Sequence, residues 1–568
     1  MNGLEILVLD GENPNALPVV QSLGRAGYRV SLAGSKLTGP AFMSRYPLRR
    51  MEYPDPFRHK SAFRDWITRC PTEERNGALF PVTDKTIHPL MEMKNQGLLS
   101  IPALLPDSES FSKIFNKKET MAIAQECNIS IPRTVVVSST NDLNLTEGFS
   151  YPCFVKPVSS KVWKGETGYN LSAEMIRSQS ELAEVVKRLT QICPVLVQEY
   201  VPGEGVGIEV LCDKGEVLLE FAHKRVHELP LTGGGSCYRV SINPPENLRQ
   251  ASRRLLERIG WHGLAMVEFK CDGTESWLME VNGRVWGSIP LAISAGADFP
   301  RSYADLLLQN KRPNFTSPPR IGLYQRKLYW DIIWFKDNLK ADKTDKRLHT
   351  RPVLLSALEW LRILWGKDRL DFFSFSDPNP FLYELKGIKE TLLRKFQSKI
   401  DFRKERIRSR QFLHPTLHRK ILILCYGNIC RSPYAENLLQ KYLPTSSFKI
   451  RSAGFHSGIG RTSPQSFMEV AAIRGINLDT HRSSLTDDDL MEWADIILIM
   501  DRVNWRQVSD LGKKYLKKTV WLGAWGHDES LLEIEDPYGK DAGKMGEILD
   551  RLDDACLRFV DDLKKRVS

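Results

Sequence analysis

Seven residues, Cys425 to Arg431, have the types and spacing of a phosphate-binding loop that carries a nucleophile. They read CYGNICR, a C-x5-R pattern, between the strand-like run ILIL and the helical run SPYAENLLQKYL. Five intervening residues can curl so that backbone N–H groups face an anion at the start of a helix. Arg431 would grip two phosphoryl oxygens, and the same field would ionise Cys425, because the thiolate is the nucleophile. Gly427 permits the tight turn, and Asn428 can pin it with side-chain hydrogen bonds.

A second set of residues, in the front half, combines lysines with carboxylates. Lys156 lies in the strand-like run CFVKPV, and Lys117 starts the helical run that contains ETMAIAQECN. Glu268 lies in AMVEFKCD, and Glu280 and Asn282 lie in LMEVNGR. Two carboxylates and an amide on adjacent strands are the hard oxygen ligands that magnesium with nucleotide phosphates requires. Lysines on an opposite lobe would meet the phosphate charge from the other side.

The elements that must position these residues indicate a multidomain chain of α/β and α+β class. The 568 residues predict three or four domain-sized units. Strand and helix alternate from residue 4, so we expect an open α/β domain over 1–110, which has the rhythm of a Rossmann-like fold. Strands grouped around separate helices predict two clamping lobes over 111–315. Residues 316–412 predict a helical connector rich in aromatic and basic side chains, and 413–568 a parallel-sheet α/β domain.

Composition and cysteine usage favour a reduced protein in the cytoplasm. The start, MNGLEILVLDG, lacks the pattern of a signal peptide, and the longest apolar runs are too short to span a membrane. The ten cysteines are irregularly spaced. Only Cys425 and Cys430 form a close pair, with no second pair to complete a zinc site.

The net charge of +11 is concentrated in one stretch. Residues 386–410 hold ten Lys and Arg against three acidic residues, which gives +7 for that segment. A solvated basic helix is the favoured interpretation. Peripheral membrane contact through 386–410 stays open as an alternative, and no specific nucleic-acid partner is predicted.

The back half resembles the low-molecular-weight protein tyrosine phosphatases over about 150 residues. The matching segments are CYGNICRSPYAE, RSAGF at 451–455, HRSSLT at 481–486, ADIILIMD ending at 501, and DPYG at 536–539. The resemblance implies that Cys425 is the nucleophile, that Arg431 clamps the phosphate and that Ser432 hydrogen-bonds the sulfur. Asp536 would be the general acid and then the base for water. Tyr538 would line the mouth and stack on an aryl phosphate.

Further features of this half leave alternatives open. Cys430 resembles the second cysteine of the family, which can trap an oxidised nucleophile as a disulfide, although a buried small residue explains it equally well. Arsenate reduction on the same fold needs more distal cysteines than Cys556, so we do not expect it. The segment FHSGIGRTSPQS departs from the family pattern, and Phe455 or His456 would have to supply its aromatic group. The substrate would be a phosphotyrosine protein or a small aryl or sugar phosphate.

The front half resembles the ATP-grasp superfamily, of the carbamoyl phosphate synthetase large-subunit type, over residues 1–310. The matching segments are VKP, QEYVPGEG, HKRVHELPLTGGGS, VEFK and MEVNGRVWGSIPLAISAGADFP. Residues 1–110 would then be the pre-ATP-grasp domain, and 111–315 the ATP-grasp domain. The resemblance implies ATP with Mg²⁺, or Mn²⁺ as an alternative, and unknown carboxylate and amine substrates.

The same resemblance assigns site residues by position. Lys117, with Lys118 as a close rival, and Lys156 would bind the ATP phosphates, and Arg284 would steady the transferring phosphate. The adenine would lie against Glu199, Tyr200 and Val201, and the ribose against Glu204. The metal ligands would be Glu268, Glu280 and Asn282. The acyl substrate would lie against Arg225 and the stretch 233–236, which includes Gly234 and Ser236.

Two interpretations of the whole chain follow from these resemblances. In the first, it is a bifunctional enzyme that joins an ATP-dependent carboxylate–amine ligase to a phosphatase. In the second, the front half is a non-catalytic ATP-sensing module that regulates the phosphatase. The intact metal ligands favour the first. The loop SSKVWKGETGYN, with few glycines over the phosphates, leaves room for the second.

Overall fold

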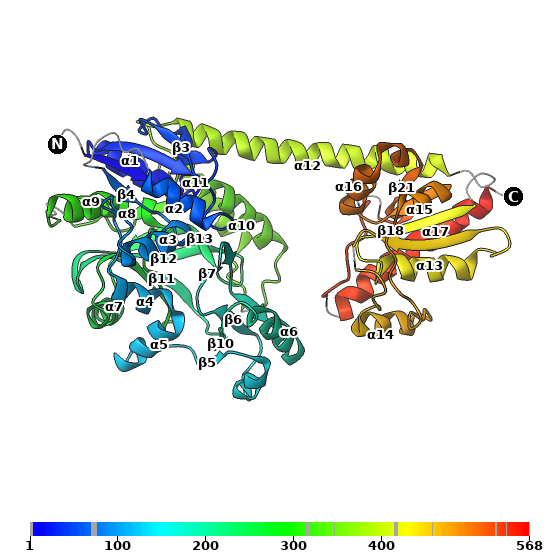
Figure 1. The fold of residues 1–568 in the computed structure, drawn as a ribbon, viewed down its shortest axis with the longest axis horizontal. Helices are drawn as coiled ribbons and strands as arrows, with labels where there is room; N and C mark the ends of the chain where they lie inside the picture. Colours follow the sequence, from blue (N-terminus) through cyan, green and yellow to red (C-terminus); the bar gives the residue numbers. More distant parts are fainter. Residues whose placement is uncertain are drawn as a thin grey trace. The chain divides into compact units, whose positions relative to one another are not determined.

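The computed structural model describes residues 4–69, 77–313, 318–345, 347–413, 419–456, 458–528, 531–540 and 542–566. The chain forms two compact units, Met1–Ile388 and Lys389–Ser568. The ribbon can be followed by colour and label in Figure 1. The domain limits expected within these units stay predictions.

The front of the first unit contains a parallel sheet of order β3-β2-β1-β4. Its strands are β1 (Glu5–Val8), β2 (Arg29–Gly34), β3 (Arg50–Glu52) and β4 (Ala78–Phe80), and its helices are α1 (Ala16–Arg25), α2 (Lys60–Thr68) and α3 (Asp84–Asn95). All residues of β1 and β4 are buried, as parallel strands covered on both faces require. The predicted α/β front is confirmed.

A small antiparallel lobe of order β5-β10-β6-β9 follows. Its elements are β5 (Thr134–Val137), β6 (Cys153–Pro157), β9 (Glu174–Ile176), α6 (Gln179–Leu189) and β10 (Val195–Glu199). Helices α4 (Ser108–Phe115) and α5 (Lys117–Glu126) precede it, and the hairpin β7 (Lys161–Lys164) and β8 (Thr167–Asn170) lies within it in sequence. Residues of β6 alternate between buried and half-buried, which leaves Lys156 on the less buried face.

The larger lobe is a seven-stranded sheet of order β15-β14-β11-β12-β13-β16-β17. Its elements are β11 (Glu204–Asp213), β12 (Glu216–Leu229), β13 (Gly235–Ile242), α7 (Glu246–Ile259), β14 (Gly263–Cys271), β15 (Ser276–Asn282), α8 (Ile289–Ala295), α9 (Phe299–Gln309), β16 (Tyr324–Arg326) and β17 (Asp368–Leu370). Adjacent strands β14 and β15 pair Glu268 with Glu280, so the two predicted metal ligands lie side by side.

The predicted helical connector contributes two strands to this sheet as well as three helices. The helices are α10 (Leu328–Lys340), α11 (Val353–Leu364) and α12 (Asn379–Phe412), and the strands are β16 and β17. Three-residue strands are too short to show an alternating pattern, so the sequence did not reveal them. His227 on β12 lies 2.7 Å from Asp331 of α10 and 2.9 Å from Glu359 of α11, and its ring stacks on Trp334. This buried polar cluster fixes the two helices against the sheet.

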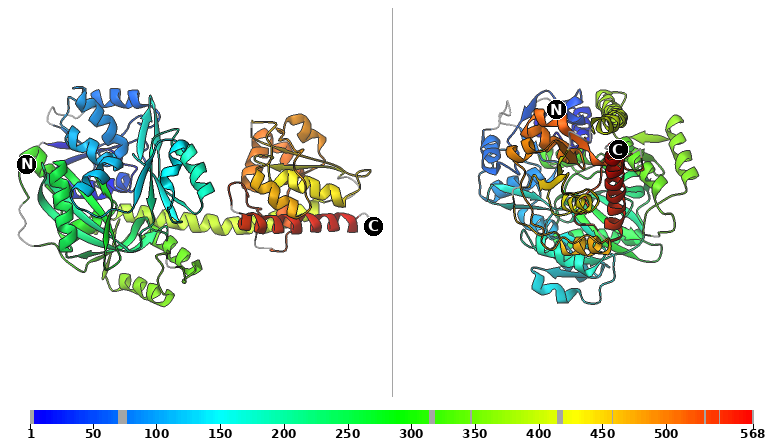
Figure 2. Two further views of the ribbon diagram at one scale, coloured as in Figure 1. Left: turned by 90° about the horizontal axis from the view of Figure 1, so that it is seen from below. Right: turned by 90° about the vertical axis from the view of Figure 1, so that its right-hand side faces the viewer.

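The second unit has a parallel sheet of order β19-β18-β20-β21. Its elements are β18 (Lys420–Cys425), α13 (Arg431–Tyr442), β19 (Lys449–Gly454), α14 (Gln465–Ile473), α15 (Asp488–Trp493), β20 (Ile496–Ile499), α16 (Arg502–Leu511), β21 (Thr519–Trp521) and α17 (Ala542–Lys565). The runs ILIL and IILI are fully buried, which confirms the predicted parallel-sheet class. Helix α17, red in Figure 2, runs along one side of this unit.

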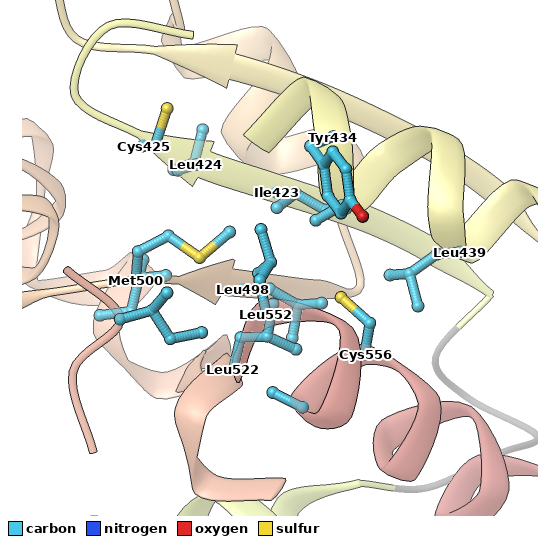
Figure 3. Close-up of a cluster of buried hydrophobic side chains, with 14 of the residues drawn as sticks. Ile423, Leu424, Cys425, Tyr434, Leu439, Leu498, Met500, Leu522, Leu552 and Cys556 are labelled. Carbon is cyan, nitrogen blue, oxygen red and sulfur yellow. The ribbon is translucent and has the colours of Figure 1, made fainter. Parts of the chain in front are cut away.

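The core of the second unit contains Cys556, which lies among Leu439, Leu498 and Leu552 (Figure 3). Burial raises the pKa of the Cys556 thiol, as is typical of a cysteine in an apolar core. Across the described ranges, no helix combines the length and apolar character needed to cross a membrane.

Candidate active sites

The C-x5-R loop joins β18 to α13, which is the placement that the sequence predicts. Cys425 is the last residue of β18 and lies at the edge of the buried cluster (Figure 3). Its Sγ accepts a hydrogen bond from the backbone N–H of Asn428 at 3.2 Å and lies 3.0 Å from Oγ of Ser432. The sulfur therefore has one backbone N–H and one hydroxyl within hydrogen-bond distance.

Asn428 holds the loop in its curved form. Its φ of 50° is left-handed, a conformation that asparagine tolerates better than most residues. Its amide Nδ2 donates to Oγ of Ser432 at 3.0 Å and to Oγ of Ser452 at 2.9 Å, and its Oδ1 accepts from the N–H of Ser484 at 2.8 Å. His481 contacts the Asn428 carbonyl oxygen at 2.7 Å. The motifs RSAGF and HRSSLT therefore support the loop from outside.

Arg431 is buried beside the sulfur and faces two carboxylates. Its Nη1 donates to Asp501 at 2.6 Å and to the Ile534 carbonyl at 2.9 Å, and its Nη2 donates to Asp536 at 2.7 Å. Burial alone would lower the pKa of Arg431, but Cys425, Asp536 and Asp501 outweigh it and raise this pKa. The structure thus brings the predicted nucleophile, clamp and acid together.

Two exposed aromatic rings adjoin the predicted nucleophile and the predicted acid in sequence. Tyr538 is 61% exposed, and Tyr426, directly after the nucleophile, is 44% exposed. Tyr426 meets the ring of His456 edge-on, with centroids 6.0 Å apart. Phe455 packs against the core instead. Of the two expected aromatic substitutes, His456 is the one whose ring meets Tyr426. Tyr426 was not anticipated, although its place inside the loop motif was a usable signal.

Cys430 is buried, and this burial, followed by the neighbouring Cys425, raises the pKa of its thiol. The described cysteines are all unpaired thiols. The redox role and the buried small residue therefore both stay open as interpretations of Cys430.

In the first unit, the predicted metal ligands converge. Nδ2 of Asn282 donates to Glu268 and to Glu280, at 3.0 Å in each case. Arg284 donates to Oδ1 of Asn282 at 3.1 Å, and Nζ of Lys117 lies 3.4 Å from Glu280. Lys118 is exposed, so the geometry favours Lys117 over its rival.

These residues fit a divalent cation. Burial raises the pKa of Glu268 despite Arg225. Burial would also raise the pKa of Glu280, but Lys117, Asn282 and Lys156 lower it to about 2. A cation between the two carboxylates would stabilise both in ionised form. Among the described residues no group of three or more His, Cys, Asp or Glu could hold a metal alone, so nucleotide phosphates would have to complete the ligand shell.

Lys156 lies in a cavity of about 380 Å³ between the two lobes. Its Nζ donates to Gln198 at 2.6 Å, and burial lowers its pKa to about 8. Glu199, Val201 and Glu268 line the same cavity. Tyr200 and Glu204 are not among its lining residues: Lys270 lies over the Tyr200 ring at 5.3 Å, and Glu204 pairs with Lys224 at 2.5 Å.

Two of the three residues predicted for the acyl substrate line this cavity too. Arg225 donates to the Gly234 carbonyl at 2.8 Å and to Glu268 at 2.5 Å. Ser236 does not line the cavity, and its hydroxyl donates to the Tyr238 carbonyl at 3.1 Å.

A second cavity of about 500 Å³ shares the lining residue Glu280 with the first. Lys117, Asn282 and Arg284 open into it. The front domain and the β7–β8 hairpin add charged residues that the sequence did not single out, namely Asp10, Glu12, Asp84, Lys85 and Lys161. Arg284 contacts Asp84 at 3.0 Å. Glu280 therefore belongs to the lining of both cavities, and both are lined by charged side chains.

Comparison with known proteins assigns both halves. The family model "Low molecular weight phosphotyrosine protein phosphatase" matches residues 420–568. A putative low molecular weight protein-tyrosine-phosphatase of Klebsiella pneumoniae is 33% identical over 144 residues, which are 25% of this chain and 96% of the relative. The C-terminal part of this chain belongs to that phosphatase family. The phosphatase Etp of Escherichia coli K12 is 32% identical over 145 residues, 26% of this chain and 95% of Etp.

The model "ATP-grasp in the biosynthetic pathway with Ter operon" matches residues 191–325, so an ATP-grasp domain precedes the phosphatase domain, while the limits 111–315 stay a prediction. Among solved structures, an L-amino acid ligase from Bacillus licheniformis is 20% identical with a TM-score of 0.43, covering 56% of this chain and 78% of the ligase. The phosphatase Wzb of Escherichia coli K30 is 34% identical with a TM-score of 0.24, covering 26% of this chain and 99% of Wzb.

Proposed function

We propose that the chain is a bifunctional enzyme that couples an ATP-dependent carboxylate–amine ligase to a phosphomonoester hydrolase. The observation that carries the hydrolase half is the position of Cys425 Sγ. It lies within hydrogen-bond distance of Asn428 N–H and Ser432, in a loop closed by Arg431, and Arg431 in turn contacts Asp536.

The hydrolase residues take complementary parts in two steps. Cys425 Sγ attacks the phosphorus atom, and the ester oxygen leaves with the proton of Asp536. Water then attacks the phosphocysteine, Asp536 takes its proton, and the thiolate departs with a hydrogen bond from Ser432. Arg431 and the loop N–H groups hold the phosphoryl oxygens throughout. In the free site Arg431 pairs with Asp536, so substrate binding would exchange that contact for phosphate.

For the ligase half, Lys117 and Lys156 would hold ATP phosphates and Glu268, Glu280 and Asn282 would hold Mg²⁺ or Mn²⁺. Bound ATP supplies the phosphoryl group that activates a carboxylate for attack by an amine. The chain contributes position and charge neutralisation and no nucleophile of its own. Further sets belong to the same proposal: Glu199, Tyr200 and Val201 for adenine, Glu204 for ribose, Arg225, Gly234 and Ser236 for the acyl substrate, and Arg284 for the transferring phosphate.

One observation favours the second candidate, an ATP-sensing module that regulates the phosphatase. The β7–β8 hairpin, which would cover the phosphates, is tied to residues 56–61 of the front domain. Trp163 donates to the Pro56 carbonyl at 3.0 Å and stacks on Phe57, and the Gly168 N–H donates to the Phe57 carbonyl at 2.7 Å. A cover held in this way supports tight nucleotide retention more directly than rapid turnover.

ADP release by the full chain separates the two candidates. We would use Cys425→Ser to silence phosphate-ester hydrolysis, and test pools of carboxylic acids and amines with ATP and Mg²⁺. The ligase requires ADP formation that depends on both an acid and an amine and is lost in Glu280→Gln. Tight ATP binding without turnover in any pool would favour the sensor.

Two exposed tyrosines beside the hydrolase residues bear on the class of phosphatase substrate. Exposed Tyr426 and Tyr538 favour an aryl phosphate, such as a phosphotyrosine protein or small aryl phosphate, over a sugar phosphate. We place the enzyme in the cytoplasm. Arg406, Arg408 and Arg410 donate to backbone carbonyls of the second unit. Membrane contact through 386–410 would therefore depend on the other lysines and arginines of that segment.

A further inference from the structure

The C-terminal end of helix α12 places a buried arginine against the segment that leads to Asp536. Arg406 is 6% exposed. Its Nη1 donates to the carbonyls of Ala524 at 2.9 Å and Gly526 at 3.2 Å. Its Nη2 donates to those of Asp528 at 3.1 Å and Leu531 at 2.7 Å. One guanidinium therefore binds four carbonyl oxygens between Ala524 and Leu531, and the described residues 526–528 and 531–540 lie in no helix or strand.

The C-terminal end of this segment contacts Arg431 of the phosphate-binding loop. The Ile534 N–H donates to the Met500 carbonyl at 2.8 Å, and the Ile534 carbonyl accepts from Arg431 at 2.9 Å. Leu532 and Ile534 are buried. The backbone also packs closely here, because a side chain at Gly523 would collide with the Leu532 carbonyl. Only four residues separate Leu531, whose carbonyl is the last one held by Arg406, from Asp536.

We infer that Arg406 is a positioning residue for the general-acid loop of the phosphatase. Its four hydrogen bonds fix the start of the segment, and the contacts of Ile534 fix the end, so that Asp536 is held beside Arg431. A guanidinium suits this task because its five N–H donors form a rigid planar fork. Without it, buried carbonyl oxygens lose their donors, and the segment must rearrange to find water or other partners.

The residue that takes this positioning role lies in the connector helix α12, outside the segment that matches the phosphatase family. Arg406 lies before residue 420, where the match to the phosphatase family begins. The helix that leaves the first unit therefore supplies a contact on which hydrolysis depends. The inference rests on the proposed role of Asp536 as the acid.

The test compares Arg406→Met with Arg408→Met in the full chain. Arg408 is a matched control, because it lies on the same helix and donates to the Thr519 carbonyl at 2.7 Å, at β21 and not in the acid segment. The measured quantity is kcat/KM for phenyl phosphate, a poor leaving group, and for p-nitrophenyl phosphate, a good one. A displaced acid affects the poor leaving group more, because that oxygen needs its proton to depart.

We expect Arg406→Met to lower kcat/KM for phenyl phosphate by about tenfold and for p-nitrophenyl phosphate by about twofold, since small displacements of a catalytic group are costly. Arg408→Met should leave the ratio between the two substrates unchanged. Equal losses on both substrates, or an equal change of the ratio in both variants, would show a structural role only and overturn the inference. If Arg406→Met does not fold, Arg406→Lys keeps the cation with fewer donors and should change the ratio in the same direction.

Asp536→Ala separates this inference from the proposed function. If that variant shows no dependence on the leaving group, the acid assignment itself fails. If it shows the dependence and the Arg406 variants do not, only the positioning role is lost.

Discussion

Replacement of Asp536 by asparagine should change catalysis and phosphate binding in opposite directions. Asn is nearly isosteric but cannot donate the proton that the leaving oxygen needs. Loss of a positioned acid costs roughly 100- to 10,000-fold. We therefore expect kcat/KM for phenyl phosphate to fall within that range, with a smaller loss for p-nitrophenyl phosphate.

The effect on phosphate binding follows from the ion pair in the free site. Arg431 and Asp536 lie 2.7 Å apart, and the Asp536 side chain is 47% exposed, so solvent screens the pair. An exposed pair of this kind contributes about 0.5–1 kcal/mol. A phosphate that displaces it must overcome that energy, and Asp536→Asn removes both the pair and a nearby negative charge. We expect the inhibition constant of inorganic phosphate to fall by about two- to fivefold.

The assay is inhibition of p-nitrophenyl phosphate hydrolysis by inorganic phosphate at fixed ionic strength, with Asp501→Asn as a comparison because Asp501 also contacts Arg431. Weaker phosphate binding in Asp536→Asn would refute the competition between Asp536 and phosphate. Equal loss of kcat/KM for the two esters would refute the acid role.

Three further predictions concern the nucleophile, its loop and the nucleotide cavity. Cys425→Ser should abolish ester hydrolysis and leave the circular dichroism spectrum unchanged; residual hydrolysis would point to another nucleophile. Asn428→Ala should lower kcat/KM more than Asn428→Gly, because both variants lose the side-chain hydrogen bonds but only alanine is strained at the left-handed φ of 50°. This strain costs about 1 kcal/mol. Equal losses of kcat/KM in the two variants would argue against backbone strain. The affinity for ATP should decrease as the pH rises through about 8, the lowered pKa of Lys156, because the neutral amine attracts phosphate less; an unchanged slope in Lys156→Met would contradict this.

The sequence was most informative where chemistry and local structure depend on the same residues. The run ILIL before Cys425 predicted a buried parallel strand, and the loop after it predicted the cradle, because both signals are contained in neighbouring residues. Glu268 and Glu280 were found in the same way, through strand-like runs that pair in the sheet.

Other features depend on contacts between distant segments, which no local pattern records. Asp84 and Lys161 line the 500 Å³ cavity from elements far apart in sequence. Strands β16 and β17 are too short to show periodicity. Arg406 lies in a stretch whose charge pattern is typical of a solvated helix, and only its four carbonyl partners distinguish it from its neighbours.

The carbonyl contacts of Arg406 have a consequence for how such a fusion can be inherited. A recombination event that replaced everything ahead of residue 420 would carry over the sheet and the cysteine loop but lose the guanidinium. The smallest gene segment that can be exchanged without loss of hydrolytic activity would then begin within the part that encodes α12. Natural variants with a different front half should retain an arginine, or an equivalent donor, at this point of the helix.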